Sequence, residues 1–242
     1  NSYWNMAYKY ENGETLAFDS KDDAERFELW LSVYWSDNNI ETEVTEDKAT
    51  GKFLLTADPD IVIRDENTRA EIQRIAEEVA TDPLMKGYKP HDDEYIRRKV
   101  ELTVQKVADT LEYDNDALDK NKKVKEGYDN SLSKALAKRV ETNAYGMEKE
   151  YQRGVCVQYS KLACRVLREL GEDAEFVGGK FTPIGKKAHF WNRLAHAWIR
   201  VRTADGNHWI YSDPTNYDNP TDASKAYFLI SDEDYNAHYI ME

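Results

Sequence analysis

Two runs of alternating apolar and polar residues constrain the fold more than any other stretch of this sequence. They are Leu194–Arg202 and residues 208–215, and they flank the dipeptide Asp205-Gly206. Alternation with a period of two is typical of half-buried strands, and Asp-Gly is a strong signal for a hairpin turn. The sequence therefore predicts an antiparallel pair of strands in a defined register.

That register brings two titratable residues to one face of the hairpin. If Asp205 and Gly206 are the central turn residues, His196 faces Thr215, and Asp213 is its diagonal neighbour. The two side chains would then touch. A three-residue loop would change the parity and send Asp213 to the opposite face, so the expectation depends on the turn.

Cys156 stands at the start of a predicted amphipathic helix that ends before Gly171. In the first turn of a helix, unpaired N–H groups and the positive end of the dipole stabilise a thiolate, which is the nucleophilic form of cysteine. Gly154 leaves backbone room beside it. The alternative is a small buried hydrophobic residue, which is the interpretation we adopt for Cys164. The inward positions are Cys156, Tyr159, Ala163, Val166, Leu167 and Leu170.

The two cysteines lie eight positions apart on that helix, about 12 Å along its axis, which is beyond the reach of a disulfide. So few cysteines suit an exported protein of an organism that makes little use of disulfides as readily as a cytosolic one. We expect a secreted or cell-surface location. The first residue is Asn1, so we also expect that any leader or anchor lies outside this sequence.

Composition excludes two classes of partner. The formal net charge of −13 opposes the counterion release on which nucleic-acid binding depends, and no Lys/Arg-rich block offsets it. No apolar run approaches the roughly 18 residues of a membrane span. The hydrophobic share of 40%, with 16 Tyr and 6 Trp, indicates a globular chain with an aromatic core.

The first 60 residues are predicted to form a small α/β unit of β-α-β-β order. We expect a strand around residues 6–10 and a helix capped by Ser20. A hairpin then joins residues 40–44 and 52–57 through Thr50-Gly51.

Residues 61–242 are predicted to form the second domain, so that the whole chain is α+β. Apolar spacings of three and four indicate two helices between residues 65 and 111. Residues 113–131 are expected to form a loop, and a helical pattern resumes over residues 132–140.

Three residues from distant parts of the chain could supply the roles of a cysteine hydrolase. Cys156 is the candidate nucleophile, His196 the base that takes its proton, and Asp213 the group that orients the base. Each also has a simpler interpretation, because a strand histidine is often structural and an Asp before Pro often forms a turn. A Cys-His-Asp set without close ligand pairs is weak for zinc, so we expect no metal and no cofactor. The other histidines, which receive no role, are His91, His189, His208 and His238.

These motifs together resemble the transglutaminase-like superfamily over about residues 95–230. Asn143-Ala-Tyr-Gly146 also looks like the segment before the nucleophile in bacterial surface members. The resemblance implies a papain-like core, in which the Cys156 helix packs against an antiparallel sheet that carries His196 and Asp213. The motifs are GVCVQYS at residues 154–160, LRELG at 167–171, HAWIRV at 196–201, Trp209, and DPT at 213–215.

A donor set for the oxyanion is also needed. The Cys156 amide is the natural first donor. The resemblance implies a second, side-chain donor upstream, for which Tyr145 is the candidate and Gln152 the reserve. An ordinary core aromatic is the other interpretation of Tyr145. The substrate-binding candidates are Phe190, Trp191 and Trp198, although the first two could equally cover the edge of the sheet.

The expected reaction is thiol-dependent acyl transfer or hydrolysis on amide bonds of a protein or peptide substrate, with a cell-wall-associated substrate as one option. Attack by the thiolate gives an acyl-enzyme. Water then makes the protein a peptidase or amidase, and an amine makes it a transglutaminase; the same triad serves both. The alternative is a catalytically silent cell-surface binding module that retains the fold.

Overall fold

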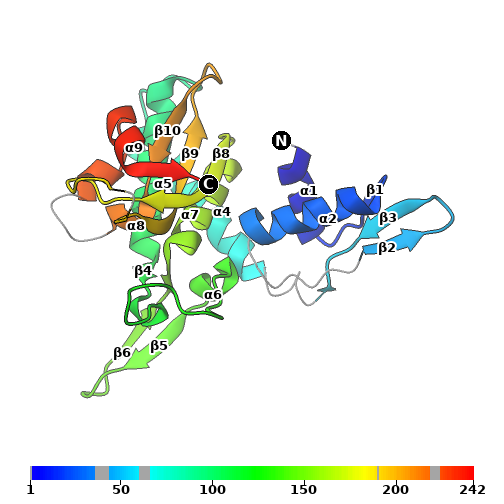
Figure 1. Cartoon of the computed structure of the whole chain (residues 1–242), viewed down its shortest axis with the longest axis horizontal. Helices are drawn as coiled ribbons and strands as arrows, with labels where there is room; N and C mark the ends of the chain where they lie inside the picture. Colours follow the sequence, from blue (N-terminus) through cyan, green and yellow to red (C-terminus); the bar gives the residue numbers. More distant parts are fainter. Residues whose placement is uncertain (1, 36–43, 60–65, 190, 219–223) are drawn as a thin grey trace.

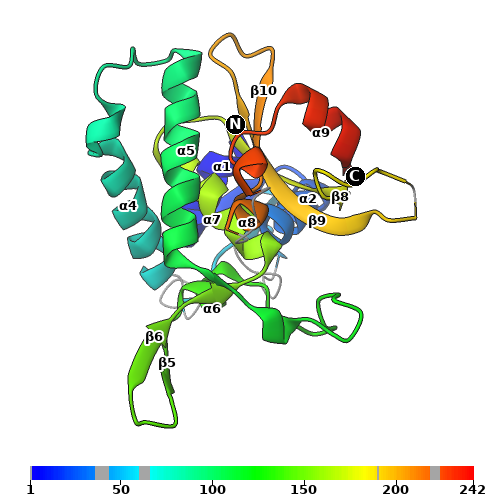
Figure 2. The same cartoon turned by 90° about the vertical axis from the view of Figure 1, so that its left-hand side faces the viewer.

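The computed structural model describes residues 2–35, 44–59, 66–189, 191–218 and 224–242. It is an α+β fold built around one helix, α7 (Cys156–Glu169), as the sequence predicted. Helices α4 (Glu66–Ala80) and α5 (Asp93–Thr110) contact one side of α7, and a four-stranded antiparallel sheet contacts the other (Figures 1 and 2). The strand order is β10-β9-β8-β11, with bounds Trp209–Ser212, Leu194–Arg202, Ala174–Phe181 and Tyr239–Met241.

The predicted β9–β10 register is confirmed. Arg202 lies opposite Trp209, and Ile199 lies opposite Ser212, which is the parity expected from the Asp205-Gly206 turn. The turn is longer than two residues, because the N–H of Thr203 still donates to the carbonyl of His208 at 3.0 Å. Strand β10 ends at Ser212, so the expected pairing of His196 with Thr215 does not form.

Asp213 instead caps a short helix, α8 (Pro214–Tyr217), and its carboxylate accepts from the backbone N–H of Asn216 at 3.2 Å. An Asp N-cap followed by Pro at the first helical position is a favourable start to a helix. The chain therefore leaves the sheet at Asp213, and the Asp213 side chain points toward His196 on β9.

Helix α7 follows its predicted pattern and ends before Gly171, whose φ of +85° is the left-handed conformation expected there. Its polar side is buried as well, because the N-terminal part of the chain covers it. Arg165 is 1% exposed, and its guanidinium binds the carboxylate of Glu11 at 2.8 Å while lying 4.0 Å from the Trp35 ring.

The N-terminal unit differs from its prediction at the start. Residues 6–10 belong to helix α1 (Ser2–Glu11) and not to a strand, because Trp4, Ala7 and Tyr10 recur every three positions on its buried face. Strand β1 (Leu16–Phe18) takes the place of the expected first strand, and helix α2 (Lys21–Trp30) follows.

The cap of α2 is confirmed, since Ser20 Oγ accepts from the Asp23 N–H at 3.1 Å. The predicted hairpin forms between β2 (Val44–Asp47) and β3 (Lys52–Leu55), with Gly51 at a φ of +71°. The earlier part of the predicted strand over residues 40–44 lies outside the described residues.

The middle of the chain supplies the strand that precedes the cysteine. A short β4 (Glu112–Tyr113) pairs in parallel with β7 (Arg153–Gly154). Between them, helix α6 (Leu132–Leu136) is shorter than predicted, because the chain enters β5 (Arg139–Thr142), which pairs with β6 (Glu148–Tyr151) in a projecting hairpin (Figure 1). Helix α9 (Asp232–His238) leads directly into β11.

The buried apolar residues of the N-terminal unit and of α7 belong to one continuous cluster, which includes Trp4, Phe27, Leu162 and Ile199. The boundary near residue 60 stays a prediction. In the described part of the chain, none of the helices combines the length and apolar character that crossing a bilayer requires.

Candidate active site

Cys156 is the first residue of α7 and is partly exposed. As the first helical residue it has no partner for its N–H four positions back in the helix. Gln158 folds back so that its Oε1 accepts from the Val155 N–H at 2.7 Å. A Cβ on Gly154 would lie 2.8 Å from that oxygen, so glycine leaves room for this brace of the first turn.

The second cysteine has a different environment. Cys164 is 1% exposed, and burial raises the pKa of its thiol to about 12. A buried thiol of this kind stays protonated and unreactive at neutral pH. Both cysteines are free, as predicted.

His196 lies on β9 and meets Asp213 across the end of the hairpin. Its Nε2 lies 2.8 Å from Asp213 Oδ2, and the two side chains are only 7% and 0% exposed. The ring of Phe181 packs against the imidazole at 4.3 Å between centroids. Because Nε2 is engaged by Asp213, Nδ1 is the nitrogen that remains for Cys156.

The pKa of His196 depends on its interactions with Asp213 and Cys156. Burial lowers the pKa of His196, but the charge and hydrogen bond of Asp213, together with a side-chain hydrogen bond and charge interaction with Cys156, outweigh it and raise the pKa to about 10. The imidazole is therefore protonated at neutral pH.

Asp213 is held by three side chains. Its Oδ2 accepts from His196, from the Tyr239 hydroxyl at 2.6 Å and from the Asn216 amide at 2.7 Å. Burial alone would raise the pKa of Asp213, but His196 and then these hydrogen bonds lower it below its usual value. The carboxylate thus stays ionised although it is fully buried.

Tyr113 is near enough to Cys156 to interact with it electrostatically. It ends β4 and pairs with Gly154 in register. Burial, followed by the charges of Cys156 and Asp114, raises the pKa of its phenol to about 12. The hydroxyl is therefore a hydrogen-bond donor near Cys156 at every physiological pH.

Comparison with known proteins identifies the family of this chain. A family profile described as "Transglutaminase-like superfamily" matches residues 84–214, which is more than half of the chain. The chain belongs to the transglutaminase-like superfamily. This fold is typically that of cysteine acyltransferases and peptidases, although many members are inactive.

One solved structure similar to this superfamily member is described as "Crystal structure of a TGase". The match covers 86% of this chain and 52% of that one, at 19% identity and a TM-score of 0.40. The chain thus spans about half the length of that protein. No curated protein matches the sequence.

Several residues proposed from the sequence lie away from the group formed by Cys156, His196 and Asp213. Tyr145 is 89% exposed at the turn of the projecting β5–β6 hairpin. The prediction that Tyr145 is an oxyanion donor is therefore wrong. The amide of Gln152 donates to the Leu136 carbonyl at 2.7 Å and so braces α6. Trp198 is 0% exposed, and its Nε1 donates to the Tyr235 hydroxyl at 3.2 Å, so it packs the core behind His196 rather than contacting a substrate.

Two further candidates lie before β9. Trp191 is 68% exposed and stacks on His189 at 4.2 Å, on the loop that leads to His196. Phe190 lies outside the described residues. Among the described side chains, no cluster of three His, Cys, Asp or Glu residues is arranged to hold a metal ion.

The sequence interpretation missed Tyr113, Asn216 and Tyr239. Asn216 had a local signal, because it lies three residues after an N-cap Asp and is thereby placed on the first turn of α8. Tyr239 had no local signal, because it lies 26 positions after Asp213 in the sequence and contacts it from strand β11.

We expect the Tyr239→Phe variant to lower kcat about tenfold with little change in KM, the effect of losing one hydrogen bond to a charged group. The phenylalanine keeps the packing but removes a donor that orients Asp213. Steady-state kinetics on an amide substrate measures the split. Tyr235→Phe is the matched control, because Tyr235 stacks on Tyr239 at 5.3 Å and contacts Trp198 instead of Asp213. Equal activities of the two variants would contradict a positioning role for Tyr239.

Proposed function

We infer that this protein is a thiol-dependent acyltransferase or hydrolase acting on amide bonds of protein or peptide substrates, with Cys156, His196 and Asp213 as its catalytic triad. One observation carries the proposal. His196 is hydrogen-bonded to the buried Asp213 carboxylate at 2.8 Å through Nε2, and the side chain of Cys156 is close enough to the imidazole to interact with it by hydrogen bond and by charge. Nucleophile, acid–base group and orienting carboxylate are thus contiguous.

The first half-reaction begins with the Cys156 sulfur attacking the carbonyl carbon of the amide. The C–S bond forms as the C=O π electrons move to oxygen, giving a tetrahedral oxyanion. When this intermediate collapses, the C–N bond breaks and the protonated His196 gives its proton to the leaving nitrogen. The products of this step are a thioester on Cys156, a free amine or ammonia, and a neutral His196.

The second half-reaction returns the enzyme to its starting state. Neutral His196 takes a proton from water or from an amine, and the oxygen or nitrogen attacks the thioester carbonyl. The C–S bond then breaks and the sulfur leaves as thiolate beside the restored imidazolium. Asp213, which remains ionised, stabilises that cation and fixes its ring.

Two donors fit the oxyanion of both intermediates. The N–H of Cys156 points out of the first turn of α7 without a helical acceptor. The Tyr113 phenol, whose pKa of about 12 is set by burial and by the nearby charges of Cys156 and Asp114, supplies the side-chain donor. Tyr113 therefore replaces Tyr145 and Gln152 in this role.

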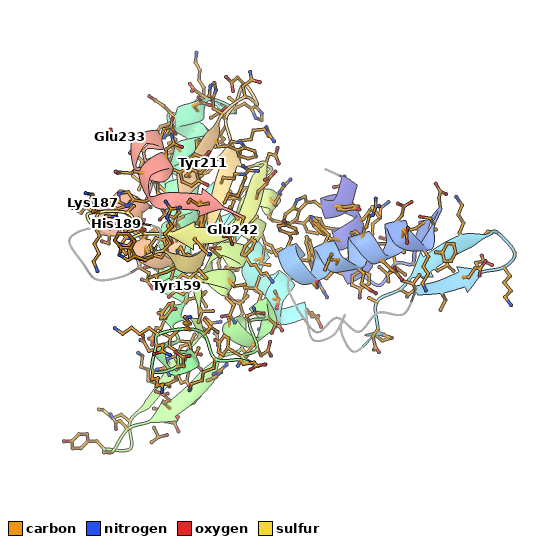
Figure 3. All side chains as sticks on the ribbon, viewed as in Figure 1. Tyr159, Lys187, His189, Tyr211, Glu233 and Glu242 are labelled. Carbon is orange, nitrogen blue, oxygen red and sulfur yellow. The ribbon has the colours of Figure 1, made fainter. Side chains whose placement is uncertain are left out.

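The acyl or amine site is expected beside the loop between β8 and β9. The exposed Trp191 ring, stacked on His189, offers an apolar platform five residues before His196. Lys187 and His189 lie together at this edge of the molecule, far from the N-terminal unit (Figure 3). A secreted or cell-surface location stays a prediction.

The deciding experiment measures ammonia release from a glutamine-containing peptide, with and without an added primary amine. Incorporation of the amine identifies a transferase, and release without incorporation identifies a hydrolase. Rapid iodoacetamide labelling of Cys156 relative to a free model thiol near pH 7 supports a primed nucleophile. Slow labelling together with no turnover would favour the binding module that retains the fold.

For Tyr113→Phe we predict a loss in kcat of about 100- to 1000-fold, the usual cost of removing one oxyanion donor. Alkylation by iodoacetamide proceeds without an oxyanion, so the labelling rate of Cys156 should stay within about twofold of the parent protein. Parallel kinetic and labelling assays separate the two effects. A similar loss in both would show that Tyr113 acts on the sulfur and not on the oxyanion.

A further inference from the structure

A pocket of about 390 Å³ lies between the β5–β6 hairpin and the loop that follows β4. It adjoins the site described above through β7, because Arg153 in its wall is three residues before Cys156. The N–H of Asp114, another wall residue, donates to the carbonyl of Gly154 at 2.9 Å. The pocket and the nucleophile are therefore carried by the same short strand pair.

The wall and the rim of this pocket differ in charge. Lys134, Arg139 and Arg153 are half-buried in the wall, whereas Asp114 is the buried acid there. The carboxylate of Asp114 accepts the Tyr128 hydroxyl at 2.9 Å. The deep part is thus cationic in a chain whose net charge is −13.

Arg139 is the wall cation whose charge is least compensated. Arg153 pairs with Glu141 at 2.9 Å, and Lys134 lies over the Tyr128 ring at 4.4 Å. For Arg139 no ion pair or hydrogen bond of the guanidinium occurs within the described residues. Its charge opposes the rise in the Tyr128 pKa that burial and the Asp114 hydrogen bond cause, so the guanidinium lies close to that ring.

We propose that this pocket binds a carboxylate of the substrate, held by Arg139 with Lys134 beside it, so that the enzyme prefers amides in peptides that carry an acidic group near the reactive carbonyl. The planar guanidinium fork matches a carboxylate in a bidentate manner. The exposed rim acids Asp116, Glu126 and Glu141 outnumber the exposed Lys125 and so disfavour a more highly charged phosphate. Tyr128 and Tyr151 supply apolar walls for the peptide chain.

The inference rests on the proposed function in one respect, namely that the reactive amide of the substrate lies at Cys156. Its test measures binding and does not need turnover. In the Cys156→Ala background, binding of Ac-Gly-Glu-Gly-NH2 and of the neutral match Ac-Gly-Gln-Gly-NH2 is titrated by NMR, following the amide signals of the peptide. The acidic peptide should bind about tenfold more tightly, the value of one charge-assisted hydrogen bond. Arg139→Gln should remove that preference.

Matched controls make the outcome specific. Arg26→Gln removes the same charge from the exposed face of α2 and should leave the preference intact. With Cys156 present, Arg139→Gln should label with iodoacetamide at the parental rate, which shows that the nucleophile is unaffected. Equal binding of the two peptides, an unchanged preference in Arg139→Gln, or tighter binding of inorganic phosphate than of the acidic peptide would overturn the proposal.

Discussion

Cys156→Ala is expected to abolish both ammonia release and amine incorporation, with a loss of about 10⁵-fold or more, as for removal of other nucleophiles that act as part of a triad. No other thiol can replace it. Cys164 is buried on α7, and burial raises its pKa to about 12, so it stays a thiol without access to a substrate. The measurement is the glutamine-peptide assay on purified variants of equal folded content.

Cys164→Ala is the matched control for this experiment. It removes the other sulfur from the same helix and should leave kcat within a fewfold of the parent, with a modest loss of stability from the small cavity. Iodoacetamide should modify the Cys164→Ala variant and spare the Cys156→Ala variant. Retained turnover in Cys156→Ala would remove the sulfur from the mechanism and end the enzymatic proposal.

Asp213→Asn is expected to lower kcat by about 10³- to 10⁴-fold, the scale seen when the orienting carboxylate of a triad becomes an amide. The amide keeps the shape and the helix cap but loses the charge. It also loses the ability to accept every donor that now converges on Oδ2, namely His196, Asn216 and Tyr239. His196 would then be free to turn and would be left buried without a counter-charge.

The same variant has a spectroscopic signature. In the parent protein the imidazole signals of His196 should titrate near pH 10, because Asp213 and Cys156 outweigh the effect of burial. In Asp213→Asn the burial effect, which lowers the pKa, gains weight, so the titration should move down toward or below the ordinary value of about 6.5. An NMR titration that stays near pH 10 in the variant would show that Asp213 does not set the charge of the histidine.

Both pKa shifts also predict how stability depends on pH. The folded-state pKa of His196 is raised, so its contribution is complete below about pH 6.5 and is lost as the pH rises toward 10. The folded-state pKa of Asp213 is lowered, so its contribution is present at neutral pH and is lost in acid, below the ordinary aspartate value. Together they place the stable range of the site between mild acid and mild base.

The parts of the site that could be predicted from sequence were those fixed by local patterns. The period of the α7 residues and Gly171 defined the helix that begins at Cys156, and the Asp205-Gly206 turn set the parity that brings His196 toward Asp213. Helix N-terminus and hairpin register are short-range properties, which a single sequence carries. The contact between β9 and α7 had to be taken from the family resemblance.

The parts that could not be predicted depend on contacts between distant segments. A parallel two-residue pairing places Tyr113 opposite Gly154, two residues before Cys156, and Tyr239 reaches Asp213 from the edge strand β11. Neither contact leaves a pattern in the sequence. The motif that contains Tyr145 forms the exposed tip of the β5–β6 hairpin, which is a long-range property of the fold. Over the short stretch of residues 6–10, a helical period and a strand alternation fit the apolar residues about equally well, so the sequence does not distinguish α1 from a strand.

The buried ion pair of Arg165 and Glu11 links helix α1 to helix α7, which carries Cys156. A guanidinium sunk in the middle of α7 can be tolerated only while an acid from elsewhere neutralises it. Removing the first 60 residues would remove Glu11 and leave the Arg165 charge buried without a partner, nine positions after Cys156 on the same helix. In a chimera that takes its N-terminal segment from a relative, an acid at the position of Glu11 and an arginine at position 165 must therefore both be present.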